Sequence, residues 1–318
     1  MRQIKSFFYS VIALLFTFGS VFGQEATMKA DSLAPATVDS LAVKDTIDRN
    51  SLLWEVSGNG LEKPSFVFGT IHMIDKKDFI FTEAMEAAFL ASEFITFEIK
   101  LDDMTNMTSQ MSMMMKAFME GGKTLKDLVS DEDYKLIEEH FAKVGLPLAL
   151  LERMKPMFLS ALASGDISPD KMSSGEIVSY EFKLMDKAKA QNKPIGGLET
   201  IEFQMGLFDQ IPYEAQAQML VEGIKNDDAS RDQFKEMVEL YKNQDLEGMQ
   251  RMVSSDEEGF GKYEDVLVVK RNEAWIPLMQ ESMSAQPTFF AVGAGHLAGE
   301  KGVIRLLEKE GYTLKPIK

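Results

Sequence analysis

The chain has 318 residues, no cysteine and a formal net charge of −16 at pH 7. The lack of cysteine excludes disulfides, a cysteine nucleophile and a cysteine-ligated zinc site. The acidic balance argues against binding of nucleic acid and against docking on anionic lipids, since both need clustered lysine and arginine.

The first 23 residues predict a secretory signal peptide. Arg2 and Lys5 precede an apolar run over 7–18, and small residues follow through Gly23. The run is shorter than the roughly 20 apolar residues of a membrane span, so we expect cleavage rather than anchoring. We therefore expect an exported protein, periplasmic or extracellular, without a stable membrane span.

The rest of the chain divides by composition. Residues 24–50 are rich in Ala, Ser, Thr and Asp and have no aromatic residue, which predicts a disordered linker. Residues 51–318 predict one folded domain, with a mainly helical insertion over about 102–260.

The first part of this domain predicts three strands and a helix. Short apolar or alternating runs place the strands at 53–56, 65–68 and 94–100. Thr82 is the expected N-cap of a helix whose apolar residues recur at helical spacing.

The middle of the chain predicts helices around one short strand. In the methionine-rich segment 104–119 we expect the adaptable side chains to fill an irregular core or line a groove. Ser130 is the expected N-cap of a further helix, another helix covers 180–190, and 193–198 predicts a short buried strand.

The last part returns to alternating helices and strands. Helices are expected over 263–283 and 301–310, and strands over 288–292 and 313–317. Together these elements predict an α/β fold with a central sheet flanked by helices.

Two segments share one pattern: a strand, glycine, two residues, histidine and an apolar residue. They are Phe68-Gly69-Thr70-Ile71-His72 and Val292-Gly293-Ala294-Gly295-His296. Glycine at a strand end lets the backbone pass close to a ligand, and the carboxyl edge of the strands is where open α/β sheets place their sites. Imidazole is the commonest metal ligand and acid–base group, so the matched pair favours function over a structural role.

The third histidine, His140, serves as a contrast. It lies within a predicted helix beside the apolar face, in Glu138-Glu139-His140-Phe141. We expect it to be a boundary residue and not a ligand.

The sequence resembles the TraB/GumN family and, within it, the Tiki metalloproteases. The resemblance spans essentially 52–317 and is weak in the helical middle. It is carried by Leu53-Trp54, Phe68-Gly69-Thr70-Ile71-His72, Phe97-Glu98-Ile99, Gly197-Leu198-Glu199-Thr200, Arg271-Asn272 and Gly293-Ala294-Gly295-His296.

The resemblance implies a site and a cofactor. It places the two histidine ligands at His72 and His296, the acidic residue at Glu98 and the arginine at Arg271. It implies a divalent metal, manganese or cobalt, with zinc possible on ligand chemistry. It also makes 51–318 a catalytic domain built from two strand–Gly-x-x-His units, in which the helical insertion forms a lid or groove.

The chemistry of these residues agrees but leaves roles open. Two imidazoles and a carboxylate suffice for a catalytic metal with free positions for water and substrate. Glu98 can be a ligand or the general base. Arg271 can pair with a core carboxylate such as Glu98 or stabilise an oxyanion. Glu199 can shape the site or cap the next helix.

We therefore expect an exported metal-dependent hydrolase, most simply a Tiki-like metallopeptidase acting on a peptide or protein. Two alternatives stay open. One is a protein that sequesters a peptide or signal without turnover, and the other is a non-proteolytic metal-dependent esterase.

Overall fold

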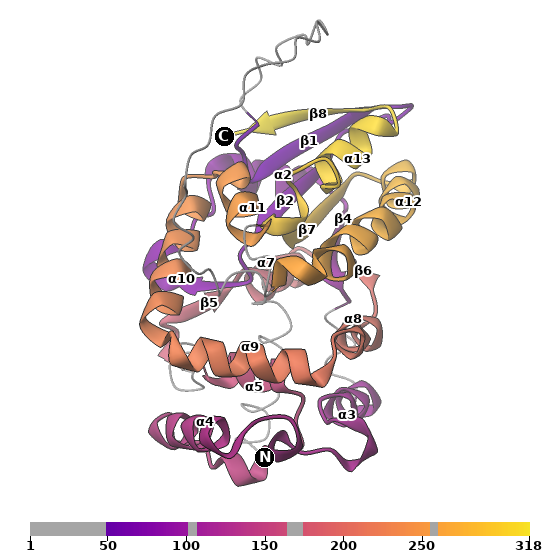
Figure 1. Cartoon of the computed structure of the whole chain (residues 1–318). Coiled ribbons are helices and arrows are strands. Elements are labelled where there is room, and N and C mark those ends of the chain that lie inside the picture. Colours follow the sequence, from indigo (N-terminus) through magenta and orange to yellow (C-terminus); the bar gives the residue numbers. More distant parts are fainter. Residues whose placement is uncertain (1–48, 101–106, 164–173, 255–259) are drawn as a thin grey trace, which may run out of the picture.

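A computed structural model describes residues 49–100, 107–163, 174–254 and 260–318 (Figure 1). The predicted signal peptide, most of the predicted linker and the start of the methionine-rich segment lie outside these residues. In the described part, no helix has the length and apolar character that crossing a membrane requires.

The core of the fold is a six-stranded sheet in the order β6-β4-β7-β2-β1-β8. Its strands are β1 Leu53–Gly58, β2 Ser65–Thr70, β4 Phe94–Ile99, β6 Ile195–Glu199, β7 Thr288–Gly293 and β8 Tyr312–Ile317. The four strands from β6 to β2 are parallel, whereas β1 is antiparallel to both β2 and β8. This sheet confirms the predicted α/β class.

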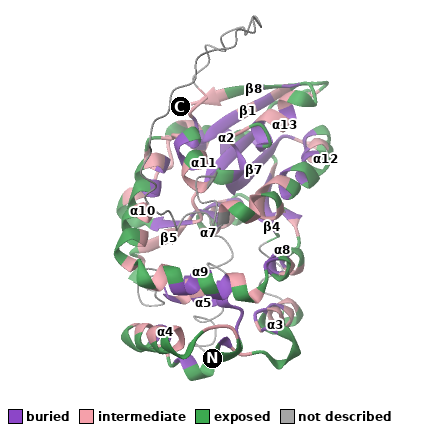
Figure 2. Cartoon of the chain, viewed as in Figure 1, coloured by how far each residue is buried: buried purple, intermediate pink, exposed green. Residues whose placement is uncertain are grey.

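The two strands that precede the histidines are the most buried of the sheet. Every residue of β2 and of β7 is buried, and both strands are nearly continuous apolar runs. Such runs are typical of parallel strands covered on both faces. Figure 2 shows that burial concentrates in this sheet, and Figure 1 shows α12 and α13 lying across one face of it.

Helices surround the sheet and form the lower part of the molecule in Figure 1. Their bounds are α2 Glu83–Ala91, α3 Met107–Lys116, α4 Asp131–Lys143, α5 Pro156–Ala163, α7 Tyr180–Ala190, α8 Ile201–Leu207, α9 Tyr213–Lys225, α10 Asp227–Lys242, α11 Leu246–Ser254, α12 Lys270–Ala285 and α13 Val303–Lys309. The predicted caps are confirmed: Thr82 accepts a hydrogen bond from the Met85 amide, and Ser130 accepts one from Asp133.

The start of the long C-terminal helix differs from the prediction. Asp265–Val269 form a wide π turn, and the regular helix α12 begins only at Lys270. Single π turns of this kind often accompany functional residues. Here the wide turn directly precedes Arg271.

A small second sheet was not predicted. β3 (Met73–Asp75) pairs antiparallel with β5 (Ile177–Ser179). The pairing is extended by a hydrogen bond from the Tyr180 amide to the His72 carbonyl, 3.0 Å. It ties the start of α7 to the residues that follow the first histidine motif.

The methionine-rich segment only partly matches its prediction. Met113 and Met119 are buried as expected. The prediction that these side chains fill the core is wrong for four methionines of α3, which are 50–81% exposed: Met107, Met111, Met114 and Met115.

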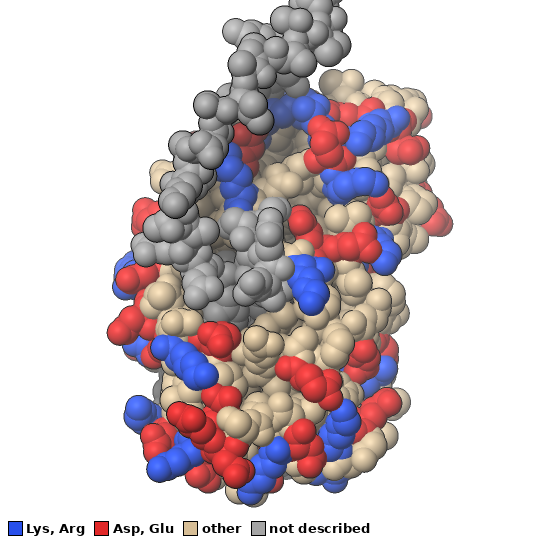
Figure 3. Space-filling model, in the orientation of Figure 1, with Lys and Arg blue, Asp and Glu red and all other residues tan. Residues whose placement is uncertain are grey.

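The surface charges are intermixed on the face seen in Figure 3. Lysine and arginine side chains are scattered there among aspartate and glutamate and do not gather into one patch.

Candidate active site

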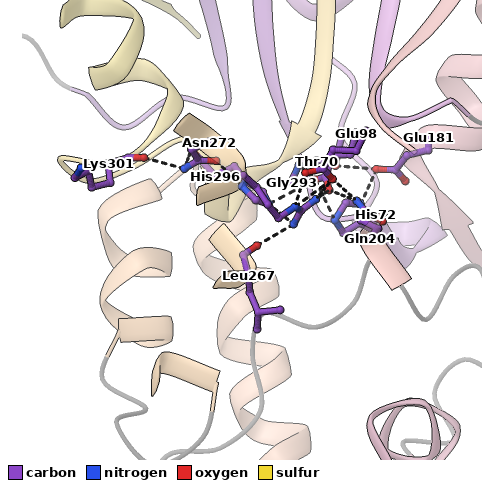
Figure 4. Close-up of polar contacts among 12 residues, drawn as sticks. Thr70, His72, Glu98, Glu181, Gln204, Leu267, Asn272, Gly293, His296 and Lys301 are labelled. Atoms are coloured by element: carbon purple, nitrogen blue, oxygen red, sulfur yellow. Dashed lines mark hydrogen bonds and ion pairs between the residues drawn. The ribbon is translucent and has the colours of Figure 1, made fainter. Parts of the chain in front are cut away.

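The two histidine motifs lie side by side because β2 and β7 are neighbouring parallel strands. Their register pairs Gly69 with Val292 and Thr70 with Gly293. Both strands therefore end at the same edge of the sheet, and each histidine lies within three residues of the end of its strand. β4 lies on the other side of β7, so Glu98 near its end reaches the same place (Figure 4).

His72, His296 and Glu98 converge around one carboxylate oxygen. Glu98 Oε1 is 3.9 Å from His72 Nε2 and 3.8 Å from His296 Nε2. The side chains are 14%, 9% and 4% exposed for His72, His296 and Glu98, so the meeting point is largely shielded from solvent. The structure thus brings together all three residues predicted as metal ligands.

Gly293 leaves the space between these atoms open. A Cβ on this residue would lie 3.1 Å from His72 Nε2, 3.2 Å from Glu98 Oε1 and 3.5 Å from His296 Cδ2. The Gly293 amide also donates a hydrogen bond of 2.8 Å to Glu98 Oε1. This glycine is needed for room at the centre, since any side chain would point among the three groups.

Gly69, the matching glycine of the first motif, serves a different purpose. Its Cβ would lie 3.1 Å from both Cα and Cβ of Ala294 and 3.1 Å from Leu297 Cδ2. The residue therefore lets the second motif pack directly on β2. Strain in the first motif falls instead on His72, whose φ of 35° is in the left-handed region that non-glycine residues rarely adopt.

Arg271 pairs with two buried carboxylates. Its Nη2 donates to Glu98 Oε2 at 2.5 Å and to Glu199 Oε2 at 2.9 Å, and its Nε donates to Glu199 Oε1 at 3.0 Å. Its Nη1 donates to the Leu267 carbonyl in the wide π turn, 2.9 Å, and lies 3.1 Å from His296 Nε2. Arg271 therefore has the buried anionic partner that the sequence predicted, in the form of two carboxylates, Glu98 and Glu199.

Glu199 shapes the site and does not cap the next helix. The cap of α8 is Thr200, whose hydroxyl accepts a hydrogen bond from the Phe203 amide. Gln204 on this helix donates from Nε2 to Glu98 Oε2 at 3.0 Å and to Glu199 Oε2 at 3.2 Å. The buried Gln204 Oε1 has no hydrogen-bond partner among the described residues.

The ionisation of the three converging residues follows from their neighbours. Burial alone would raise the pKa of Glu98, but Arg271 and the two imidazoles offset this and hold that pKa well below its usual range. Burial and the Arg271 charge lower the pKa of His296 to about 3. Burial would also lower the pKa of His72, yet Glu181 raises it above its ordinary value.

Two residues that contact the histidines were given no role by the sequence. Glu181 Oε1 lies 2.7 Å from His72 Nδ1, and Asn272 Oδ1 lies 2.6 Å from His296 Nδ1. Asn272 follows Arg271 in a quoted motif, so a signal existed for it. Glu181 had none, because only the β3–β5 pairing brings α7 to His72.

His140 lies apart from this group. Its Nε2 is 2.7 Å from the Ala163 carbonyl oxygen, and its ring contacts Phe141. That is a local structural contact of α4.

The family follows from the sequence match. The model of the TraB/PrgY/gumN family matches residues 52–316. The chain belongs to the TraB/PrgY/gumN family.

Relatives of this TraB/PrgY/gumN protein include metalloproteases of the Tiki group. It is 24% identical to Metalloprotease TIKI1 of Homo sapiens, over 89% of this chain and 65% of the relative. It is 24% identical to Metalloprotease TIKI2 of Danio rerio over 84% of this chain and 61% of the relative, and 21% identical to a Metalloprotease TIKI homolog of Amphimedon queenslandica. The chain spans less than two thirds of the length of these relatives. No solved structure matches it.

The names of these relatives imply a metal ion, which the site fits in donor type more closely than in spacing. Two imidazole nitrogens and a carboxylate oxygen suit manganese, cobalt or zinc. Ligands in a tetrahedral site with bonds of about 2.1 Å are about 3.4 Å apart. The separations of 3.8 and 3.9 Å are wider, and among the described residues no group of three or more His, Cys, Asp or Glu side chains is arranged to hold a metal. Tetrahedral coordination by these three donors would require each imidazole nitrogen to lie closer to Glu98 Oε1 than it does here.

The charge balance of this TraB/PrgY/gumN site also fits a cation. The cluster holds three buried carboxylates and one guanidinium: Glu98 and Glu199 contact Arg271, and Glu181 contacts His72. With all of them ionised the cluster carries two excess negative charges, or one if His72 is protonated. An unbalanced buried charge is costly, and a divalent cation would remove the imbalance.

Proposed function

We propose that this protein is an exported metal-dependent peptidase that cleaves a peptide or protein substrate. The observation that carries the proposal is the convergence of His72 Nε2, His296 Nε2 and Glu98 Oε1 around the space that Gly293 leaves open. The metalloprotease names of the relatives and the excess of buried carboxylate charge support it.

The proposed metal ligands are the two Nε2 atoms and Glu98 Oε1. A divalent metal bound there supplies Lewis acidity, which lowers the pKa of water and polarises a substrate carbonyl. Glu98 suits a ligand because its pKa is held low and its second oxygen is fixed by Arg271. The same ionised carboxylate can accept a proton, so Glu98 is the candidate for both the ligand and the general-base role.

Arg271 supports the proposed site as a charge-balancing residue. A guanidinium has five N–H groups. All five are engaged here, by Glu98, Glu199, the Leu267 carbonyl and His296 Nε2. Oxyanion stabilisation would require Arg271 to give up one of these contacts, and the contact to His296 Nε2 is the one that metal binding would compete for.

The experiment that tests the proposal combines metal uptake with turnover. Purified protein is titrated with manganese, cobalt and zinc and assayed on a panel of peptides and esters. We expect metal uptake and peptide cleavage in the wild type and loss of both in His72→Ala and His296→Ala, with His140→Ala unchanged. Metal uptake without cleavage of any peptide would favour the esterase or the sequestering protein, and absence of uptake would exclude the metal-dependent reading.

Two further parts of the proposal have their own tests. If residues 1–23 act as a cleaved signal peptide, the mature protein should begin close to residue 24. N-terminal sequencing of the protein secreted by a host cell would test this. The helical insertion, which includes α3 and α9, is proposed to form a lid or groove for the substrate. Cross-linking of a photoreactive substrate peptide to these helices would test that placement.

A further inference from the structure

The hydrogen-bond partner of His72 fixes where its imidazole carries hydrogen. His72 Nδ1 lies 2.7 Å from Glu181 Oε1, and the same carboxylate accepts from the hydroxyls of Thr70 at 2.8 Å and Ser179 at 3.0 Å. An ionised carboxylate can only accept hydrogen bonds. Nδ1 must therefore carry the hydrogen, which leaves the lone pair of the neutral ring on Nε2.

The hydrogen-bond partner of His296 also places the ring hydrogen on Nδ1. The Asn272 amide nitrogen donates to two carbonyls, those of Lys301 at 2.9 Å and His296 at 3.3 Å. Its oxygen must then face His296 Nδ1, and this oxygen is an acceptor. The Arg271 Nη1 contact to His296 Nε2 agrees, because a guanidinium only donates and needs a lone pair there.

His140 has the opposite arrangement. Its Nε2 faces the Ala163 carbonyl oxygen at 2.7 Å, and a carbonyl only accepts. In the neutral ring the hydrogen is therefore on Nε2. The three histidines of the chain thus comprise two with Nδ1–H and one with Nε2–H, which supplies an internal standard.

We propose that Glu181 and Asn272 are positioning residues, which lock His72 and His296 as Nδ1–H tautomers so that neither Nε2, each within 4 Å of Glu98 Oε1, carries a hydrogen. Two imidazole lone pairs and a carboxylate oxygen then lie around the space beside Gly293, and the lone pair of His296 Nε2 accepts from Arg271 Nη1. Partners of this kind, which hold the second nitrogen of a metal-binding histidine, raise its basicity and set its orientation. The use of these lone pairs by a metal rests on the proposed function, whereas the tautomers do not.

The tautomers can be read directly in the metal-free protein. With ¹⁵N-labelled histidine, a long-range ¹H–¹⁵N correlation spectrum at alkaline pH distinguishes the two neutral forms, and three histidines give a simple spectrum. His140→Gln assigns one signal and His72→Gln a second. We expect Nδ1–H for His72 and His296 and Nε2–H for His140. An Nε2–H form, or rapid averaging of both forms, at either site histidine would overturn the proposal.

Variants at Glu181 test whether the contact positions His72 for metal binding. Glu181→Leu removes the acceptor, whereas Glu181→Gln keeps an acceptor oxygen of similar reach. We expect Mn²⁺ affinity, measured by electron paramagnetic resonance, to fall about 100-fold in Glu181→Leu and about 10-fold in Glu181→Gln. The Nδ1–H tautomer of His72 should be lost in the first variant and retained in the second.

The controls separate this inference from the proposed function. Asp186→Asn removes one exposed carboxylate from the same helix α7 and should leave Mn²⁺ affinity unchanged. Thermal unfolding confirms that each variant is folded. Wild-type Mn²⁺ affinity in Glu181→Leu would overturn the positioning role. If the wild type bound no metal, the proposed function would fail, while the tautomer measurement would still decide the hydrogen positions.

Discussion

The two Gly-x-x-His segments are alike in sequence pattern and differ in almost every contact. In the first, Gly69 permits close packing of one segment on the other, and the histidine backbone is strained. In the second, Gly293 keeps the centre of the site open and its amide binds Glu98. The repeated pattern therefore fixes where the histidines emerge from the sheet, and each glycine meets a separate steric demand.

The partners of the two imidazoles differ as well. The first is held by the buried carboxylate of Glu181, whereas the second is held by the neutral amide of Asn272 and lies against Arg271. A carboxylate favours the protonated imidazole, and a guanidinium opposes it. Two residues that look equivalent in the sequence thus have opposite electrostatic surroundings.

The largest expected consequence is a difference in proton affinity. Because the pKa of His72 is raised above 6.5 and that of His296 is lowered to about 3, their proton affinities should differ by more than about a thousandfold in the metal-free protein. A histidine NMR titration should show His72 becoming charged first as the pH falls. Titration of His72 and His296 over the same pH range would contradict this prediction.

The same shifts predict opposite effects on stability. Proton binding to His72 stabilises the fold at low pH, and this stabilisation is lost as the pH rises through the raised pKa. His296 acts in the other direction: as the pH falls from about 6.5 towards 3, the unfolded state takes up a proton that the folded state resists, so stability falls. Urea unfolding of His72→Gln and His296→Gln across this range would separate the two contributions.

The next largest effect is expected at Gly293. Gly293→Ala places a methyl group among the three proposed donors, so Mn²⁺ affinity should fall by more than about 100-fold and activity should be lost. Calorimetric titration with Mn²⁺ measures this. Gly295→Ala is the matched control, since a Cβ there meets nothing within 4 Å. Equal affinity in the two variants would mean that the space beside Gly293 is not the metal position.

Gly69→Ala should act on stability instead. Its Cβ would press on the backbone of Ala294 and on Leu297, and overpacking of this kind costs about 1–3 kcal/mol. Urea unfolding should show the loss, with Mn²⁺ affinity of the folded protein reduced less than in Gly293→Ala. A larger effect on metal affinity than on unfolding would show that both glycines serve the centre.

The smallest effect is expected at the residue after the first glycine. Thr70 donates to Glu181, and the matching residue in the second motif is Ala294, which has no such hydroxyl. Thr70→Val removes one buried hydrogen bond and should cost about 1 kcal/mol of stability. We expect Mn²⁺ affinity to change only a few-fold, because Ser179 and His72 still hold Glu181. A loss as large as that of Glu181→Leu would contradict this.

The sequence predicted the sheet strands and the common edge of His72 and His296 from local patterns, whereas Glu98 was predicted only through the family resemblance. Apolar runs mark the strands, and parallel neighbours deliver their ends to one edge. It could not predict Glu181 or Gln204. Glu181 reaches the site only through the three-residue strands β3 and β5, which are too short to show a period, and Gln204 reaches it through the packing of α8.

The exposed methionines of α3 show a similar limit. Composition predicts adaptable apolar side chains, but which of them face inward depends on what the helix packs against. Only Met113 of α3 is buried.

The position of β7 sets the order in which this protein can be completed. It lies between β4 and β2, yet Gly293 at its end follows Glu98 by 195 residues. During synthesis β2 and β4 are completed long before β7, which lies between them in the sheet. Contacts between residues so far apart in the sequence form slowly. The strand that fills this place also brings the second histidine. A chain released before Thr288 would therefore lack the middle of its sheet and the second histidine of the proposed metal site.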